Sequence, residues 1–416
     1  MSLYGLRDMD SKCAEVRDLI RVLTRKVDGC TEPFQSIDVG NSLYGLNRMT
    51  AEDEEVRALL RSLLPKIGSC SSGLTPKAVG NALYGLRGLS SDCAEVRALL
   101  TALTPLVTDC NVDFNNQEVA NSLYGLRSMS SSYQEVRALV TALVPKVRSC
   151  RHPLTAQGIG MSLYGLRGTT SYCPEVRSIL SILLHQIENC PSPLSGQGVG
   201  CALYGLRGMH SDVREVQAVL WALAPKIWAC EDTLSPPMIA NALYGLNKMS
   251  DEQFNVREIL AALTPKLQSC RGTFTAQDVS ASLFGFRNMG SAGRSEGAEP
   301  VELLDILEAL AVKVEGCEEG LSELEYDNAM QGLLNLDDQS TIVHNVRRAL
   351  WGLQSKGKSS GEEVRSDEAL YKLLDDTIDN IDGGDAAYYD GGLSSRANYG
   401  QHTSSNDDRA FSKWYR

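Results

Sequence analysis

The sequence contains no apolar run of the ~20 residues that a membrane-spanning helix requires. Its N-terminus shows no basic stretch followed by an apolar one, so neither a secretory signal nor a transit peptide is visible. Histidine is scarce, with five residues in 416. No cluster of His, Asp and Glu stands out at any one place. These absences argue against a membrane protein and against an enzyme, and they give no reason to expect a cofactor or a metal.

An excess of basic residues is also missing. Residues 1–280 contain 27 Lys+Arg and 27 Asp+Glu, whereas residues 281–416 contain 13 and 25. The net charge of −12 therefore comes entirely from the C-terminal third of the chain. No part has the strongly basic balance of a domain that binds nucleic acid mainly through phosphate contacts.

What the sequence does contain is a 40-residue repeat. The pentad Ser/Ala-Leu-Tyr-Gly-Leu recurs every 40 residues, and Ser-Leu-Phe-Gly-Phe forms an eighth copy at Ser282. The first seven copies begin at Ser2, Ser42, Ala82, Ser122, Ser162, Ala202 and Ala242. Positions within a repeat are numbered 1–40, starting from Asn41, Asn81 and their equivalents. A fixed period of this length is typical of solenoid proteins, in which each unit packs only on its neighbours.

Each repeat predicts a first helix that begins near position 35. Thr75 and Thr155 are favourable N-caps, and Pro76 follows at the first helical position, where a missing N–H costs nothing. Apolar residues at positions 34 and 39, such as Leu74 and Val79, have the spacing of a hydrophobic staple. The helix then continues through the pentad.

A second helix is predicted from about position 12 onward. Asp92 and Glu95 have the spacing of a capping box, as do Ser132 with Glu135 and Asp212 with Glu215. The apolar stripe of this helix is formed by Val96, Leu99, Leu100, Leu103 and Val107. A proline recurs at position 25, for example Pro105, and is expected to kink or break the helix. We therefore predict an all-α fold, an α-solenoid of stacked two-helix repeats.

The register of the repeat predicts three parts. Residues 1–327 form eight repeats, with a seven-residue insertion at about 290–300 in the eighth, and residues 328–354 form a degenerate capping repeat. Residues 355–416, rich in Ser, Gly and Asp, are predicted to be an acidic, largely disordered tail. One amphipathic stretch of the tail is a candidate for folding on a protein partner: Leu370, Leu373, Leu374, Ile378 and Ile381. Because the first repeat starts inside its first helix, we expect either an open end or a chain that is part of a longer repeat protein.

Eight of the twelve cysteines occupy position 30. Equivalent atoms of stacked helices lie about 8–10 Å apart, too far for a disulfide or a shared metal ion. Position 30 continues the apolar stripe of the second helix, so we expect small buried hydrophobic side chains. Twelve unpaired thiols favour a reducing compartment inside the cell.

Four further positions are nearly constant. A glycine at position 5 lies mid-helix, where it costs about 1 kcal/mol relative to alanine, and predicts a close approach of two helices. Glutamate at position 15 and arginine at position 17 predict ion pairs between repeats on a solvated ridge. Lysine at position 26 is expected to interact with the negative end of the second helix's dipole.

One face of the first helix carries a set of residues that suits RNA. Gln117, Asn121, Tyr124 and Ser128 fall at i, i+4, i+7 and i+11, and Arg127 flanks them. An amide, an aromatic ring and an arginine in each unit can stack on and hydrogen-bond successive bases of single-stranded RNA. The alternative is that the tyrosines fill the seam between repeats. The candidate binding residues are Tyr44, Tyr84, Tyr124, Tyr164, Tyr204, Tyr244, Asn81, Asn121, Asn241, Gln117, Gln157, Gln197, Arg87, Arg127, Arg167 and Arg207.

The segment Thr155-Ala-Gln-Gly-Ile-Gly-Met-Ser-Leu-Tyr-Gly-Leu resembles the first helix of octotricopeptide repeats. In that family an Ala-Gln or Pro-Gln start leads to an Ala-Asn-X-Leu-Trp-Ala-Leu core, with which Asn81-Ala-Leu-Tyr-Gly-Leu aligns. The similarity covers residues 1–327. It departs from the family in its 40-residue unit rather than 38, and in lacking the Pro-Glu-Trp segment and a C-terminal nuclease-like domain. The resemblance implies an organellar RNA-binding protein, in a mitochondrion or chloroplast, that acts in transcript processing, stability or translation.

Two functions therefore remain open. The first is binding of single-stranded RNA in the concave groove of the solenoid. The second is a protein–protein interaction scaffold that holds a protein or peptide there, which the neutral array and the acidic tail favour.

Overall fold

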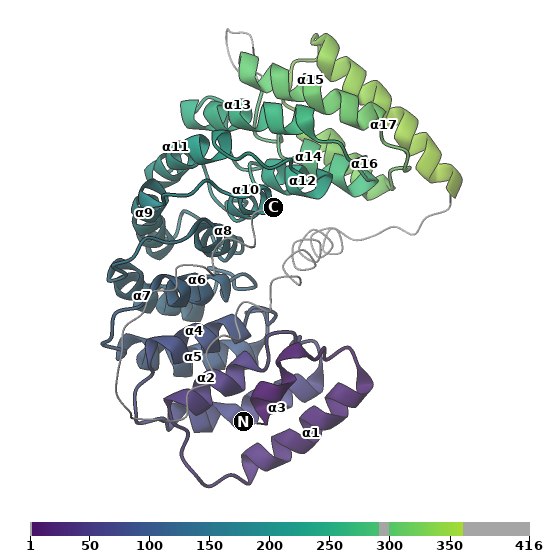
Figure 1. The fold of residues 1–416 in the computed structure, drawn as a ribbon. Helices are drawn as coiled ribbons and strands as arrows, with labels where there is room; N and C mark the ends of the chain where they lie inside the picture. The colour runs from purple at the N-terminus through teal and green to yellow at the C-terminus, as the bar shows by residue number, and fades with distance from the viewer. Residues whose placement is uncertain (1, 291–298, 361–416) are drawn as a thin grey trace, which may run out of the picture. The chain divides into compact units, whose positions relative to one another are not determined.

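The computed structural model describes residues 2–290 and 299–360, which belong to one compact unit. Within these ranges the chain forms eighteen helices and no strand (Figure 1). The predicted all-α solenoid is confirmed, because helices of the same kind pack on one another in series. The predictions for the insertion and the acidic tail fall almost wholly on residues 291–298 and 361–416, outside the described residues.

The first helices of successive repeats form an inner row, which lies on the inner side of the bend in Figure 1. A short 3₁₀ helix, η1 (Leu3–Asp8), begins this row. It continues with α2 (Ser36–Tyr44), α4 (Pro76–Gly85), α6 (Asn116–Tyr124), α8 (Ala156–Tyr164), α10 (Gly196–Tyr204), α12 (Pro236–Tyr244), α14 (Ala276–Phe284) and α16 (Glu323–Gly332).

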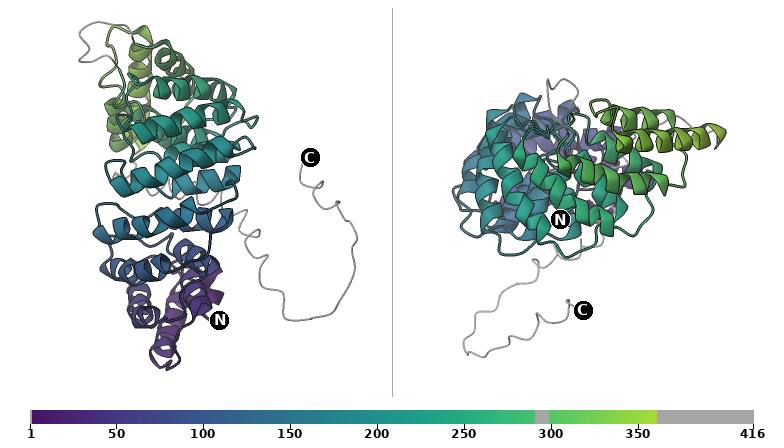
Figure 2. Two further views of the ribbon diagram at one scale, coloured as in Figure 1. Left: turned by 90° about the vertical axis from the view of Figure 1, so that its left-hand side faces the viewer. Right: turned by 90° about the horizontal axis from the view of Figure 1, so that it is seen from above.

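The second helices form an outer row, seen as parallel rungs in the left view of Figure 2. The row consists of α1 (Ala14–Asp28), α3 (Glu54–Gly68), α5 (Ala94–Thr108), α7 (Gln134–Arg148), α9 (Pro174–Asn189), α11 (Arg214–Trp228), α13 (Phe254–Ser269), α15 (Val301–Glu315) and α17 (Thr341–Ser360). The ninth helix pair, α16 and α17, stacks on α14 and α15. Its last helix continues six residues past the predicted boundary at residue 354.

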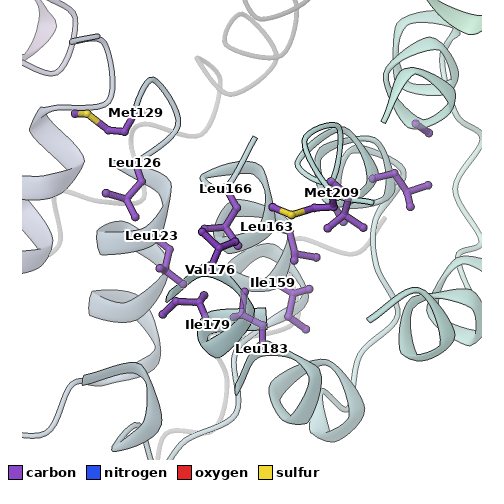
Figure 3. Packing of buried hydrophobic residues seen from close by; sticks show 14 of the residues in the cluster. Leu123, Leu126, Met129, Ile159, Leu163, Leu166, Val176, Ile179, Leu183 and Met209 are labelled. Carbon is purple, nitrogen blue, oxygen red and sulfur yellow. The ribbon is translucent and has the colours of Figure 1, made fainter. Parts of the chain in front are cut away.

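The hydrophobic core lies between the two rows and repeats with the sequence. Figure 3 shows Leu163 of α8 beside Val176 and Leu183 of α9, and the three side chains are buried. The inner helices begin at the predicted N-caps. Thr75, for example, accepts a hydrogen bond from the backbone N–H of Ala78 at 3.2 Å. Core and caps therefore recur at the same positions in each repeat.

The predicted capping boxes of the outer helices are wrong. α5 begins one residue later than expected, with Cys93 as a cap that makes no side-chain hydrogen bond, so Glu95 lies at the second helical position rather than the third. The turn is closed instead by Arg97 at position 17, whose Nη1 donates to the carbonyl oxygens of Ser91 and Asp92 at 2.7 and 2.8 Å. The same contact is made by Arg17, Arg57, Arg137, Arg177 and Arg257.

The predicted ion pairs between repeats exist, but with a different arginine. Glu55 and Glu95 at position 15 pair with Arg21 and Arg61, which lie at position 21 of the preceding repeat. The lysines at position 26 also act between repeats. Lys146 donates to the carbonyl oxygens of Thr108, at 3.0 Å, and of Cys110, at the C-terminal end of the preceding outer helix. Lysine thus interacts with the negative end of its neighbour's helix.

The prolines at position 25 do not break the outer helices. α5 runs through Pro105 to Thr108, and the N–H of Asp109 still bonds to the carbonyl of Pro105 at 2.9 Å. The predicted break is therefore wrong, since the helix continues for three residues past the proline in its last turn. All twelve cysteines are free, and seven of the eight at position 30 are buried, as predicted. Burial raises the pKa of the Cys150, Cys230 and Cys317 thiols.

The glycines at position 5 make the closest contacts between inner helices. A Cβ atom at Gly165 would lie 1.9 Å from the carbonyl oxygen of Leu123 in the preceding repeat, and one at Gly125 would lie 2.0 Å from that of Leu83. The same collision is found at Gly45, Gly85, Gly205, Gly245, Gly285 and Gly332. The predicted close approach is therefore confirmed.

This contact can be tested with a matched pair of substitutions. Gly165→Ala should destabilise the protein by about 1–3 kcal/mol, because the methyl group forces two backbones apart. Gly5→Ala, at the same repeat position but with no atom within 4 Å of the added Cβ, should be neutral or slightly stabilising. Urea denaturation followed by circular dichroism measures both. Equal stability of the two variants would contradict the role given to the glycine.

Candidate binding surface on the inner helices

The aromatic residues at position 4 form a continuous column through the inner row. Seven consecutive ring pairs, from Tyr4–Tyr44 to Tyr244–Phe284, have centroids 5.5–5.8 Å apart. These distances are within the 4.5–7 Å range in which aromatic rings interact. The short spacing follows from the neighbouring glycines at position 5, which let the inner helices approach until the rings stack.

The rings of this column are covered on both faces. Tyr164 and Tyr204 are completely buried, and Tyr84, Tyr124 and Tyr244 are at most 8 % exposed. Tyr44 is half-buried between Tyr4 and Tyr84. A base cannot stack on a ring whose two faces already carry neighbouring rings. The six candidate tyrosines therefore pack the seam between repeats, as the alternative interpretation predicted. The prediction that bases stack on these rings is wrong.

The chemistry of the column is that of a buried stack. Burial is the main cause that raises the pKa of Tyr44 to about 12, and the neighbouring Tyr84 and Tyr4 raise it further. Arg87 and Arg7 act in the opposite direction, because their positive charge favours the phenolate. The hydroxyl group of Tyr44 therefore stays neutral at physiological pH.

The arginines at position 7 lie over the rings of the column. The guanidinium carbon is 4.2–5.1 Å from the ring centroid in the pairs formed by Arg87, Arg127, Arg167 and Arg207 with the tyrosine three residues earlier. Arg127 also donates from Nε to the carbonyl oxygen of Arg87 at 3.0 Å and from Nη1 to the hydroxyl of Tyr124 at 2.8 Å. The predicted Tyr and Arg residues are thus brought together, with the ring orienting the cation.

Two repeats lack this arginine and compensate one residue later. Asn47 and Asn247 occupy position 7, and each is followed by a cation, Arg48 or Lys248, at position 8. Between Arg87 and Arg287, the repeats that have arginine at position 7 have Gly, Ser or Asn at position 8. Eight successive repeats therefore carry one cation each: Arg7, Arg48, Arg87, Arg127, Arg167, Arg207, Lys248 and Arg287. Comparison of positions 7 and 8 as a pair would have revealed this pattern in the sequence.

Seven of these cations, from Arg48 to Arg287, belong to a surface that we call the inner stripe, defined as positions 37, 1, 4, 7 and 8 between Ile37 and Asn288. Arg7 precedes the stripe and pairs with Asp8. The stripe contains eight Lys and Arg residues, Lys77 among them, and no Asp or Glu. Burial lowers the pKa of Lys248, and the nearby charges of Arg287 and Arg207 lower it further. Positive charge is therefore concentrated here, although residues 1–280 are neutral as a whole.

The predicted amides differ in accessibility. Gln117 and Gln157 at position 37 are exposed and Gln197 is partly exposed. At position 1, Asn81 is partly exposed, whereas Asn121 and Asn241 are buried. Among the cations, Arg127 and Arg167 are buried and the other six reach the surface. The accessible part of the stripe thus consists of cations along one edge and of position 37 along the other.

Across residues 2–290 and 299–360, no three His, Cys, Asp or Glu side chains gather in a way that could hold a metal ion. None of the helices in these ranges has the length and apolarity needed to cross a membrane. No protein-family model matches the chain, and no curated protein matches its sequence. The similarity to octotricopeptide repeats therefore rests on the motifs alone.

Replacement of Tyr164 tests whether the column is structural. Tyr164→Ala should destabilise the protein by about 3–5 kcal/mol, the usual cost of truncating a buried aromatic side chain. Tyr164→Phe should have a much smaller effect, because Phe284 already occupies the same place in the column. Urea denaturation measures both free energies of unfolding. A Tyr164→Ala variant of undiminished stability would show that the ring is not part of the core.

Proposed function

We propose that the inner stripe binds single-stranded RNA through its sugar–phosphate backbone. The observation that carries this proposal is the single cation that each of eight successive repeats places at position 7 or 8. A row of single charges on a regular scaffold matches a ligand that carries one charge per unit. Single-stranded nucleic acid is such a ligand, since each nucleotide contributes one phosphate.

The spacing of the aromatic column beside the cations supports a nucleic acid rather than an acidic peptide. Successive repeats are 5.5–5.8 Å apart at the aromatic column. Side chains on one face of an extended peptide recur every two residues, about 6.6–6.8 Å, and lose register within a few repeats. A nucleic-acid backbone has several rotatable bonds between phosphates and can extend beyond the ~3.4 Å rise of a stacked strand. One nucleotide per repeat is therefore the natural register.

The arginines are well prepared for phosphate. A guanidinium group is planar, always charged and able to donate two parallel hydrogen bonds to a phosphate. Here the arginines at position 7, such as Arg87 and Arg207, lie against rings of the column, so little side-chain freedom is lost when an anion binds. The aromatic residues thus contribute to binding indirectly, as supports for the cations.

Recognition of bases is left to positions 37 and 1. Gln117 and Gln157 present exposed amides, and Asn81 a partly exposed one. These groups can donate to and accept from base edges. The resemblance to octotricopeptide repeats points to RNA and to an organelle, and the twelve free cysteines fit a reducing compartment. We propose a role in transcript processing, stability or translation on these grounds.

The proposal predicts a strong dependence on salt. The triple variant Arg48→Gln, Lys248→Gln, Arg287→Gln should weaken binding of a fluorescein-labelled oligouridylate by at least about tenfold at low salt, through the loss of phosphate contacts. The slope of log K against log salt, expected near −4 for six accessible cations, should fall by about 2, at roughly 0.7 per contact. Fluorescence anisotropy over a salt series measures both.

A matched control removes the same charge elsewhere. Arg148, Arg151 and Arg271 are exposed and lie outside the inner stripe. Their replacement by glutamine should leave both the affinity and the salt slope nearly unchanged. If the two triple variants lose affinity equally, binding follows net charge and the inner stripe is not the site. If the unmodified chain binds no oligonucleotide, the RNA proposal fails.

Protein binding remains a second candidate because of one feature of the outer row. Trp221 and Trp228 of α11 and Phe254 of α13 are each at least 50 % exposed, and the rings of Trp221 and Phe254 are 5.8 Å apart. Exposed tryptophans that cluster in this way are typical of protein interfaces. At the N-terminal end of the array the same positions hold charged residues, Arg61 and Glu54.

The two candidate functions use different surfaces and can be separated. Trp221→Ser with Trp228→Ser should reduce the recovery of protein partners in pull-downs from the native source, including pull-downs treated with ribonuclease, while leaving oligouridylate affinity unchanged. The triple variant of the inner stripe should do the reverse. Partners recovered equally with the wild-type chain and the tryptophan variant would show that the aromatic patch is not an interface.

A further inference from the structure

Two of the four tryptophans of the chain lie on one exposed face of α11. Trp221 and Trp228 are seven residues apart, and Pro225 is exposed between them. Phe254, on the neighbouring helix α13 of the outer row (Figure 1), is also exposed, and its ring centroid is 5.8 Å from that of Trp221. We call Trp221, Trp228 and Phe254 the aromatic patch. This part of α11 is therefore apolar along two turns of its outer face.

The repeat does not need large side chains at these positions in order to fold. Position 21, where Trp221 lies, holds Thr or Ser in the three preceding repeats and Ala261 in the next one. Position 28, where Trp228 lies, is otherwise Asp, Gly, Thr, Arg, Glu or Gln. In the first two repeats position 21 is an arginine that pairs with a glutamate of the following repeat, and Asn255 replaces that glutamate here. Exposed rings that packing does not require are explained by a ligand.

The surroundings of the aromatic patch disfavour a charged ligand. From Gln217 to Ala229, α11 contains one charged residue, Lys226, and this lysine donates to the carbonyl oxygen of Cys190 at 2.5 Å. The guanidinium carbon of Arg257 is 5.7 Å from the ring centroid of Phe254, where it repels a cation that would otherwise bind to the ring. The ligand that suits this surface is therefore apolar and uncharged.

The size of the aromatic patch fits a peptide rather than a folded partner. A buried aromatic side chain covers about 150–250 Å², so three half-exposed ones offer roughly 250–400 Å². A stable interface between two folded proteins, a second copy of this chain included, needs about 800 Å² on each side. With so small an area, the ligand must lose little conformational freedom on binding. This condition favours a peptide that is ordered before it binds.

We propose that the aromatic patch binds a proline-rich peptide in the polyproline II conformation. Such a peptide is already extended in solution, and exposed aromatic side chains are the groups that recognise it in proteins. The spacing agrees as well. Seven residues of α-helix separate Trp221 from Trp228 by about 10.5 Å along the axis, and a polyproline II helix repeats every three residues, about 9.3 Å. Prolines three residues apart can therefore contact the two tryptophans in succession.

This inference deepens the second candidate function, protein binding, and rests on it; it is independent of RNA binding by the inner stripe. A helical peptide is the competing occupant, because its side chains seven residues apart have the same spacing as the two tryptophans. It fits less well, since a helix shorter than about 12–15 residues is marginal in water and must fold as it binds. The small area of the aromatic patch offers little to offset that cost.

Fluorescence anisotropy with a fluorescein-labelled decaproline peptide tests the proposal on the full chain. The wild-type protein should bind decaproline at least about tenfold more tightly than a Gly–Ser peptide of equal length. Trp221→Ser and Trp228→Ser should each weaken the binding of decaproline by roughly tenfold, as expected of anchor residues in an interface. Because Ser181 occupies the position of Trp221 in the preceding repeat, the Trp221→Ser variant should keep the wild-type circular dichroism spectrum.

Trp351→Ser is the matched control. This tryptophan is 65 % exposed on α17, outside the aromatic patch, and its replacement should leave the affinity for decaproline unchanged. The inference is overturned if decaproline binds no more tightly than the Gly–Ser peptide. It is also overturned if Trp351→Ser loses as much affinity as Trp221→Ser, since binding would then follow the number of exposed tryptophans.

Comparison with the pull-downs separates this inference from the function on which it rests. If Trp221→Ser with Trp228→Ser loses protein partners but the wild-type chain does not bind decaproline, protein binding stands and the polyproline ligand fails. Tighter binding of an amphipathic helical peptide of equal length would also overturn the inference. Binding of decaproline that depends on both tryptophans supports it, whether or not the chain binds RNA.

Discussion

The structure depends on the contact between the glycine at position 5 of one repeat and the backbone carbonyl at position 3 of the preceding one. A methyl group at Gly165 would lie 1.9 Å from the carbonyl oxygen of Leu123, so only glycine permits this spacing. The outer helices bury large side chains such as Leu99 and Leu139, and side chains of this size usually hold packed helices about 8–10 Å apart. Two rows with different spacings cannot remain straight. The array therefore bends toward the inner row (Figure 1).

The same contact determines the chemistry of the inner surface. Because the inner helices are so close, the aromatic residues at position 4 stack on one another instead of facing solvent. The stacked rings then support the arginines at position 7. The close packing of the inner helices thus produces a row of oriented cations that recur once per repeat. The glycine, the ring and the cation are three parts of one inter-repeat contact.

Several of these features were predictable because they depend on local sequence. The N-cap at Thr75, the need for a small residue at Gly165 and the burial of Cys110 follow from helix chemistry and periodicity alone. Other features depend on a shift of a single residue. Glu95 has the spacing of a capping box with Asp92, but the helix starts at Ala94, one residue later than that spacing implies. The contact that the turn does make, from Arg97 to the carbonyl oxygens of Ser91 and Asp92, joins residues five and six apart and is not part of any capping-box pattern.

The pairing of candidate residues was predictable from the sequence, but their packing was not. Helical periodicity places Tyr124, Arg127 and Gln117 on one face of the first helix, and in the structure Arg127 lies over the ring of Tyr124. It could not show that the tyrosine is covered, because the coverage comes from Tyr84 and Tyr164, 40 residues away on either side. The cation lies at position 7 in one repeat, as Arg87, and at position 8 in another, as Arg48 after Asn47. This shift was equally hard to recognise, because positions 7 and 8 each look merely variable when taken alone.

In the proposed RNA complex, affinity and base selectivity would come from different positions of the inner stripe. If the inner stripe binds RNA as we propose, cations that recur in every repeat would hold each phosphate in the same way and could not distinguish one base from another. Any selectivity must come from positions that vary, above all position 37, where Ile37, Lys77 and Pro237 differ from the glutamines. Gln117, Gln157 and Gln197 lie in three consecutive repeats and present the same donor and acceptor. If one nucleotide faces each repeat, the central part of the array should favour three identical bases in succession.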